Sequence, residues 1–150
     1  MFNGCTALTA APELPAMTLA QNCYSYMFRN CTSLATPPSL PATTLVKSCY
    51  SSMFDSCTSL TAAPELPVNV MANGCYSSMF RGCTSLRTPP VLSATTLASS
   101  CYSSMFSETG LTSAPELPAS ALASDCYNSM FYGCASLSTP PVLSAASTQS

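Results

Sequence analysis

The dipeptide Met-Phe occurs six times in this chain of 150 residues, at Met1, Met27, Met53, Met79, Met105 and Met130. Four of the intervals are 26 residues long and the last is 25. A unit of this length cannot bury its own apolar face, so copies of it stack on one another. The repeat therefore predicts a repeat solenoid that forms a single domain over residues 1–150, with about six coils starting near the six Met-Phe pairs.

Three apolar columns recur once in each unit, as a continuous core between stacked coils requires. Each buried leucine or methionine contributes roughly 1.5–3 kcal/mol by the area it removes from water. The first two columns form the predicted core ladder: Leu8, Leu34, Leu60, Leu86, Leu111 and Leu137, and Leu14, Leu40, Leu66, Leu92, Leu117 and Leu143. The third column consists of Leu19, Leu45, Met71, Leu97 and Leu122.

The local patterns predict short parallel strands, short helices and proline-rich coil. Leu19, Cys23, Met27 and Cys31 are four residues apart, which indicates one apolar stripe of a helix over residues 21–29. Residues 6–11 are small, hydroxylated and partly alternating, as in a short strand. The strand must stop at the proline that follows it in every unit, because proline donates no ladder hydrogen bond. The full set is Pro12, Pro38, Pro64, Pro90, Pro115 and Pro141.

A second period of about 52 residues overlies the first. Glu13, Glu65 and Glu116 stand at one position of alternate units, and serine or valine occupies it in the others. A glutamate in every coil would place like charges about 4.8 Å apart. Two interpretations remain open: relief of this repulsion, and duplication of a two-coil ancestor.

Composition excludes several function classes. Only 7% of residues are charged and the formal net charge is −2, so no basic patch is available for nucleic acid. The chain contains no histidine and no tryptophan. Ser-His and Cys-His catalysis are therefore excluded, and no Cys-x-x-Cys pair suggests a metal. No apolar run is long enough to span a membrane. We expect a protein that is not an enzyme and that has no cofactor and no metal site.

Residues 26–34 read Tyr-Met-Phe-Arg-Asn-Cys-Thr-Ser-Leu, and similar segments recur at 53–60, 79–86 and 130–137. This motif resembles the Met-Phe-x-x-Cys-Ser-Ser-Leu core of BspA-like leucine-rich-repeat surface proteins, and it covers essentially the whole chain. The resemblance implies a leucine-rich-repeat solenoid, an extracellular or cell-surface location in bacteria, and a role in adhesion. The proline-rich segment of each unit and a second cysteine column depart from the family pattern.

Ten cysteines fall into two columns, and two hypotheses account for them. In the first, they are small buried apolar residues with free thiols, which is the interpretation we favour. In the second, one disulfide closes each coil. Pairs eight residues apart would be Cys23–Cys31, Cys49–Cys57, Cys75–Cys83 and Cys126–Cys134; pairs 18 apart would be Cys5–Cys23, Cys31–Cys49, Cys57–Cys75 and Cys83–Cys101. Eight residues of helix span about 12 Å, too far for a bridge.

The sequence shows no polar capping repeat, and Met1 occupies a position inside the repeat. We therefore expect Met1 to be an internal residue of a longer precursor. An uncapped solenoid favours head-to-tail association, which makes a filament. The first hypothesis for function is thus an extracellular filament subunit that self-associates through its ends. The alternative is an adhesin, as a fragment of a longer surface protein that binds a host or cell-surface protein or a glycan.

Overall fold

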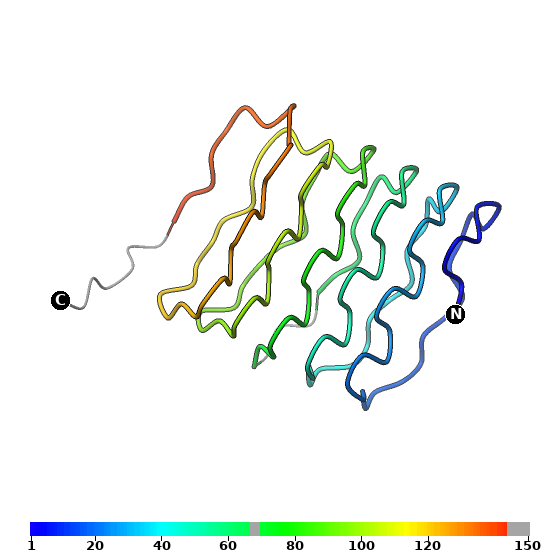
Figure 1. The fold of residues 1–150 in the computed structure, drawn as a ribbon, viewed down its shortest axis with the longest axis horizontal. Coiled ribbons are helices and arrows are strands. Elements are labelled where there is room, and N and C mark those ends of the chain that lie inside the picture. Colours follow the sequence, from blue (N-terminus) through cyan, green and yellow to red (C-terminus); the bar gives the residue numbers. More distant parts are fainter. Residues whose placement is uncertain (67–69, 144–150) are drawn as a thin grey trace.

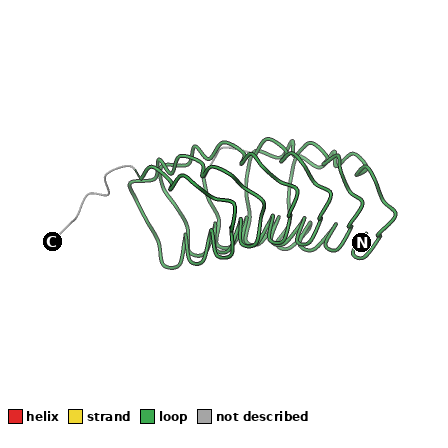
Figure 2. Ribbon diagram, turned by 90° about the horizontal axis from the view of Figure 1, so that it is seen from above, coloured by secondary structure: helices red, strands yellow, loops and turns green. Residues whose placement is uncertain are grey.

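The computed structural model describes residues 1–66 and 70–143, and within these residues the chain forms turns, bends and isolated bridges with no helix and no extended strand. Successive segments of about 26 residues lie side by side, from the blue first coil to the red last coil (Figure 1). Seen from above, the coils are flattened loops with a front and a back layer (Figure 2). Four isolated parallel bridges join adjacent coils in the described chain: Ala10 with Thr36, Thr96 with Ala121, Ser113 with Thr139, and Leu117 with Leu143. The prediction of a strand over residues 6–11 is therefore wrong, because pairing there is limited to the single bridge at Ala10, just before Pro12.

The prediction of a helix over residues 21–29 is wrong, because the front layer of each coil is a run of consecutive turns. We call these runs the turn ribbons; they cover residues 21–30, 47–56, 73–82, 99–108 and 124–133. In each ribbon, alternate amides donate to the carbonyl three residues earlier, as Met53 does to Tyr50. The amides between them donate to the next coil, as Phe54 does to Met79 at 2.9 Å. An α-helix would use all its interior amides internally and leave none for a neighbour.

Every fourth residue of a turn ribbon has a positive φ, which ends any helical path. In the second ribbon these residues are Ser48, Ser52 and Ser56, with φ of 53°, 53° and 62°. A residue with a side chain pays roughly 1–2 kcal/mol for this conformation. Five hydrogen bonds between adjacent ribbons offset the cost, at about 0.5–1.5 kcal/mol each. The conformation recurs at Asn22, Tyr26, Asn30, Gly74, Ser78, Gly82, Ser100, Ser104, Glu108, Asp125, Ser129 and Gly133.

The turns send side chains alternately inward and outward in pairs. Cys49, Tyr50, Met53 and Phe54 are fully buried and alternate with the pairs Ser-Ser and Asp-Ser. Each inward aromatic ring stacks on its counterpart in the next coil. Phenylalanine ring centroids lie 5.6 to 5.9 Å apart along Phe2, Phe28, Phe54, Phe80, Phe106 and Phe131. Tyrosine ring centroids lie 5.8 to 6.0 Å apart along Tyr24, Tyr50, Tyr76, Tyr102 and Tyr127.

The leucine columns lie between the two layers and join the aromatic ladders in one hydrophobic cluster. In the first column the inner members Leu34, Leu60, Leu86 and Leu111 are fully buried, and Leu8 and Leu137 pack partly buried against the cluster. In the second column Leu14, Leu40, Leu66, Leu92 and Leu117 are buried, whereas Leu143 is 65% exposed. Leu19, Leu45, Met71 and Leu97 of the third column are buried, and Leu122 is 54% exposed.

The fifth coil is one residue shorter, and Gly110 makes this possible. Two residues separate Cys83 from Leu86 in the fourth coil, but Gly110 alone separates Thr109 from Leu111. A Cβ atom on Gly110 would collide with the carbonyl oxygen of Thr84 and stand 2.7 Å from an Arg87 guanidinium nitrogen. That guanidinium donates to the Gly110 carbonyl at 2.9 Å. The shortened turn thus requires a residue without a side chain.

We predict that Gly110→Ala lowers the free energy of unfolding by about 2 kcal/mol or more, since backbone must move to admit the methyl group. Gly4→Ala is the control, because Gly4 has a φ of 76° but no atom within 4 Å of an added Cβ. It should cost only about 1 kcal/mol. Urea unfolding of both variants measures the difference. If both variants lost the same free energy of unfolding, the close approach of Gly110 to the Thr84 backbone would not be what stabilises the shortened turn.

Candidate interaction surfaces

The residues that the structure describes offer no metal centre: nowhere do three His, Cys, Asp or Glu side chains gather in a way that could hold an ion. Within the same ranges, no helix has the length and apolar character needed to cross a bilayer. The features that remain as candidates are the two faces of the stack, its two ends and its columns of thiols.

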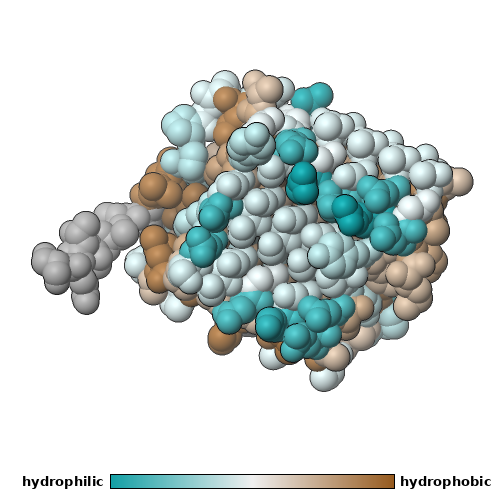
Figure 3. Space-filling view, viewed as in Figure 1, coloured by the Kyte–Doolittle hydropathy of each residue, from teal (hydrophilic) through white to brown (hydrophobic). Residues whose placement is uncertain are grey.

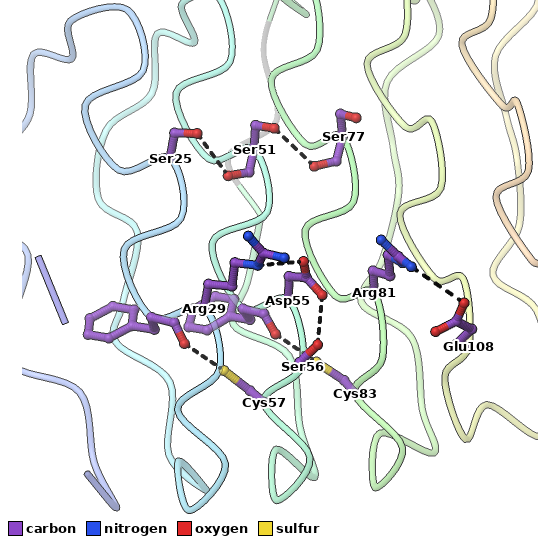
Figure 4. A network of polar contacts seen from close by, with 12 residues as sticks. Ser25, Arg29, Ser51, Asp55, Ser56, Cys57, Ser77, Arg81, Cys83 and Glu108 are labelled. Carbon is purple, nitrogen blue, oxygen red and sulfur yellow. Dashed lines mark hydrogen bonds and ion pairs between the residues drawn. The ribbon is translucent and has the colours of Figure 1, made fainter. Parts of the chain in front are cut away.

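The turn face, formed by the outward residues of the turn ribbons, is polar and rich in serine. It is mostly pale in Figure 3, with small groups of hydrophilic side chains. A row of hydroxyl groups runs along it, each bonded to the next coil (Figure 4). Ser25 donates to the Ser51 carbonyl at 3.2 Å, Ser51 to Ser77 at 3.3 Å, and Ser77 to Ser103 at 3.4 Å. These serines use part of their hydrogen-bonding capacity to join coils.

Four charged residues of the turn face form two ion pairs between adjacent coils. Arg29 Nε lies 3.1 Å from Asp55 Oδ2, and Arg81 Nη2 lies 3.6 Å from Glu108 Oε1 (Figure 4). The Asp55 side chain is only 8% exposed, and Ser56 also donates to it at 2.9 Å. Both pairs join neighbouring coils in the ordered interior of the stack. Lys47 and Asp125, near the starts of their ribbons, are exposed and form no ion pair within the described chain.

The back layer forms the proline face, made by residues 11–16, 37–42, 63–66, 89–94, 114–119 and 140–143. Shallow hollows of about 440 Å³ and 360 Å³ lie between its coils. Pro64 and Glu65 of the third coil line both hollows, so the two hollows lie on opposite sides of that coil. Glu13, Glu65 and Glu116 are exposed, and no ion pair involves them in the described part of the chain. Sequence reasoning found the glutamates but not the hollows.

All ten cysteines are free in the structure. The thiols of the first column point to a main-chain carbonyl of the preceding coil: Cys57 Sγ lies 3.0 Å from the Phe28 oxygen, and Cys83 Sγ lies 3.1 Å from the Phe54 oxygen (Figure 4). In the fifth coil Thr109 takes the cysteine's place, but its hydroxyl donates to the Phe106 carbonyl of its own coil at 2.7 Å. A buried residue with a hydroxyl thus occupies this position without a disulfide.

The environment of the inner thiols keeps them protonated. Burial raises the pKa of Cys57 and of Cys75 to about 12, and that of Cys101 to about 11. Thiols in the same column add a smaller effect of the same sign, as Cys31 does on Cys57. The thiolate is the reactive form, so these inner residues are chemically inert. Cys5 and Cys23 lie in the first coil and are exposed.

The two ends of the stack have opposite hydrogen-bonding character. Between adjacent turn ribbons the inter-coil amides donate only to the following coil, whereas outside the ribbons amides such as those of Ala35 and Ser138 donate to the preceding coil. In the described chain the amides of Phe131 and Gly133 in the last ribbon donate to no carbonyl. Likewise the carbonyls of Met1 and Asn3 accept from no amide. Within the ribbon layer, one end is therefore a row of donors and the other a row of acceptors.

No family model, curated protein or solved structure matches this chain. The resemblance to BspA-like proteins therefore rests on the Met-Phe-x-x-Cys-Thr-Ser-Leu motif and stays a prediction. The cysteine-rich composition and the regular spacing of phenylalanine and tyrosine are features of the molecule itself.

We predict that iodoacetamide at pH 8 modifies Cys5 and Cys23 of the folded chain rapidly and leaves Cys57, Cys75 and Cys83 unmodified. Exposure permits attack at the first two, whereas burial and the absence of thiolate protect the others. Mass spectrometry of peptides locates the adducts. After unfolding in denaturant without a reductant, all ten thiols should react. Two reactive thiols under those conditions would instead establish four disulfides.

Proposed function

We propose that this chain is a non-enzymatic structural protein whose copies stack end to end into a filament. The observation that carries the proposal is the opposite character of the two ends, donors at the last ribbon and acceptors at the first. A two-fold contact would set donors against donors, so only a head-to-tail contact satisfies both rows. Such a contact is heterologous and does not close, and it therefore continues into a fibre.

The existing junctions supply a geometry for this contact. Phe28 donates to Met53 at 3.0 Å, and Phe106 donates to Met130 at 3.0 Å. Continuing the repeat places the Phe131 amide against the Met1 carbonyl of a second copy. The Phe131 ring would then stack on Phe2 of that copy, as Phe106 and Phe131 stack at 5.9 Å within one chain. Half-buried rings at both ends would become buried, which favours association.

The class and setting of the filament belong to the same proposal. The stacked coils and leucine columns support a leucine-rich-repeat-like solenoid. The motif shared with BspA-like proteins supports an extracellular or cell-surface location in bacteria. The low fraction of charged residues, 7%, leaves little electrostatic repulsion between copies.

Sedimentation velocity over a hundredfold concentration range, with negative-stain microscopy, tests the proposal. The unaltered chain should form species that grow with concentration and appear as unbranched threads. Phe131→Glu should remain monomeric, because it places a charge without a partner in the contact. Val70→Glu is the matched control, since Val70 is 86% exposed in the third coil and outside the glutamate column, and it should assemble normally.

The proposal would be contradicted by a chain that stays monomeric at every concentration and whose thermal unfolding does not change with concentration. That result would favour the second candidate, a surface-binding module that contacts a host or cell-surface protein or a glycan. The observation that supports this alternative is the proline face, whose hollows have no occupant from the described chain.

A further inference from the structure

Hollows on both sides of the third coil form an interrupted groove on the proline face. The hollow beside Pro38 and Pro41 shares Pro64 and Glu65 with the hollow beside Pro90. A third hollow, of about 550 Å³, adjoins the second through Ser93. The first two hollows follow one another along the axis of the stack, whereas the second and third lie between the same two coils. Its walls are rigid, because proline rings fix the backbone and lose little entropy when a ligand binds.

The groove has negative charge without a counter-charge from the chain. Glu65 lines two of the hollows, and Glu13 and Glu116 stand at the same position two coils away on either side. The basic side chains are engaged elsewhere: Arg29 and Arg81 form the ion pairs of the turn face, Arg87 donates to the Gly110 carbonyl, and Lys47 lies in the second turn ribbon. A second copy cannot cover this face with its own proline face, because glutamates would oppose glutamates. The groove therefore fits a basic partner.

The spacing of the glutamates selects the conformation of that partner. A parallel bridge joins Leu117 to Leu143 next to the glutamate column, so adjacent coils there are about 4.8 Å apart and alternate coils about 9.6 Å. A polyproline II helix advances about 3.1 Å per residue and presents every third residue on one side, a repeat of about 9.3 Å. In a β-strand, residues three apart point to opposite sides. In an α-helix, residues three, four and seven apart share a side, at about 4.5, 6 and 10.5 Å along the axis, and none of these intervals equals the glutamate spacing.

We propose that the proline face binds an extended polyproline II segment of a partner protein that carries a basic residue at every third position. Each basic side chain pairs with one glutamate of the column, and the residues between them lie in the apolar hollows against Pro64 and Pro90. Polyproline II segments are pre-ordered, so little conformational entropy is lost on binding. This surface is separate from the ends of the stack and does not depend on filament formation.

The probe is a fluorescent peptide of five Lys-Pro-Pro triplets, titrated with the chain in fluorescence anisotropy at low salt. A peptide of identical composition with its five lysines placed consecutively is the control for net charge. The triplet peptide should bind at least tenfold more tightly than the control. Its affinity should fall as salt rises, because exposed ion pairs are screened.

Variants of the chain locate the site. Glu65→Gln should weaken binding of the triplet peptide about two- to fivefold, as expected for one exposed ion pair. The triple variant Glu13→Gln, Glu65→Gln, Glu116→Gln should weaken it at least tenfold. Glu108→Gln, which removes a charge from the turn face, should leave it unchanged. Equal binding of both peptides, or an unaffected triple variant, would overturn the proposal. Binding of the triplet peptide by a chain that does not form filaments would still support this proposal.

Discussion

The structure depends on how the backbone amides of the turn ribbons divide their hydrogen bonds. One set closes turns within a coil, as Cys49 does to Val46 at 3.2 Å, and the set between them reaches the next coil, as Tyr50 does to Cys75 at 3.0 Å. Buried amides must find a partner, and this division satisfies both sets without a helix or a strand. It holds adjacent coils in a register in which each residue lies against its own counterpart. The side-chain ladders and the two unlike ends follow from that register.

The register between coils produces a continuous core, because it places each apolar residue against the same residue type in the next coil. Because like residues lie against like, Phe54 stacks between Phe28 and Phe80, and the inner phenylalanines are fully buried. The same register would be costly for charges, which would repel along a column. Two arrangements avoid this. On the turn face an acid stands against a base, as Asp55 does against Arg29, and on the proline face glutamates are kept two coils apart.

The repeat length and the apolar columns could be predicted from sequence, since stacking requires like residues at fixed intervals. The helix could not be excluded, because a spacing of four between Cys23 and Met27 suits both a helix of 3.6 residues per turn and turns that repeat every four. The distinguishing signal was the alternation of apolar and polar pairs, such as Met-Phe and Ser-Ser. A single helical stripe of period 3.6 would drift away from it. Serines in positive-φ positions, such as Ser52, gave no such signal, because serine has no strong preference for this conformation.

The candidate surfaces were only partly accessible to sequence reasoning. The glutamate column follows directly from the 52-residue period. The hollows beside Pro64 depend on how neighbouring coils pack, and no linear pattern contains that information. Likewise, the missing residue near Gly110 was visible as an interval of 25, but its consequence, contact with the Thr84 backbone, needed the coordinates. The difference between the donor end and the acceptor end of the ribbon layer becomes visible only once the direction of the hydrogen bonds between ribbons is known.

Scalar couplings across hydrogen bonds, measured by NMR on labelled protein, test the division of amides most directly. The account predicts coupling from the Tyr50 amide nitrogen to the Cys75 carbonyl carbon, and from the Met53 amide nitrogen to the Tyr50 carbonyl carbon. Coupling from Tyr50 to Val46 and from Met53 to Cys49, the partners four residues earlier that a helix would use, would contradict it.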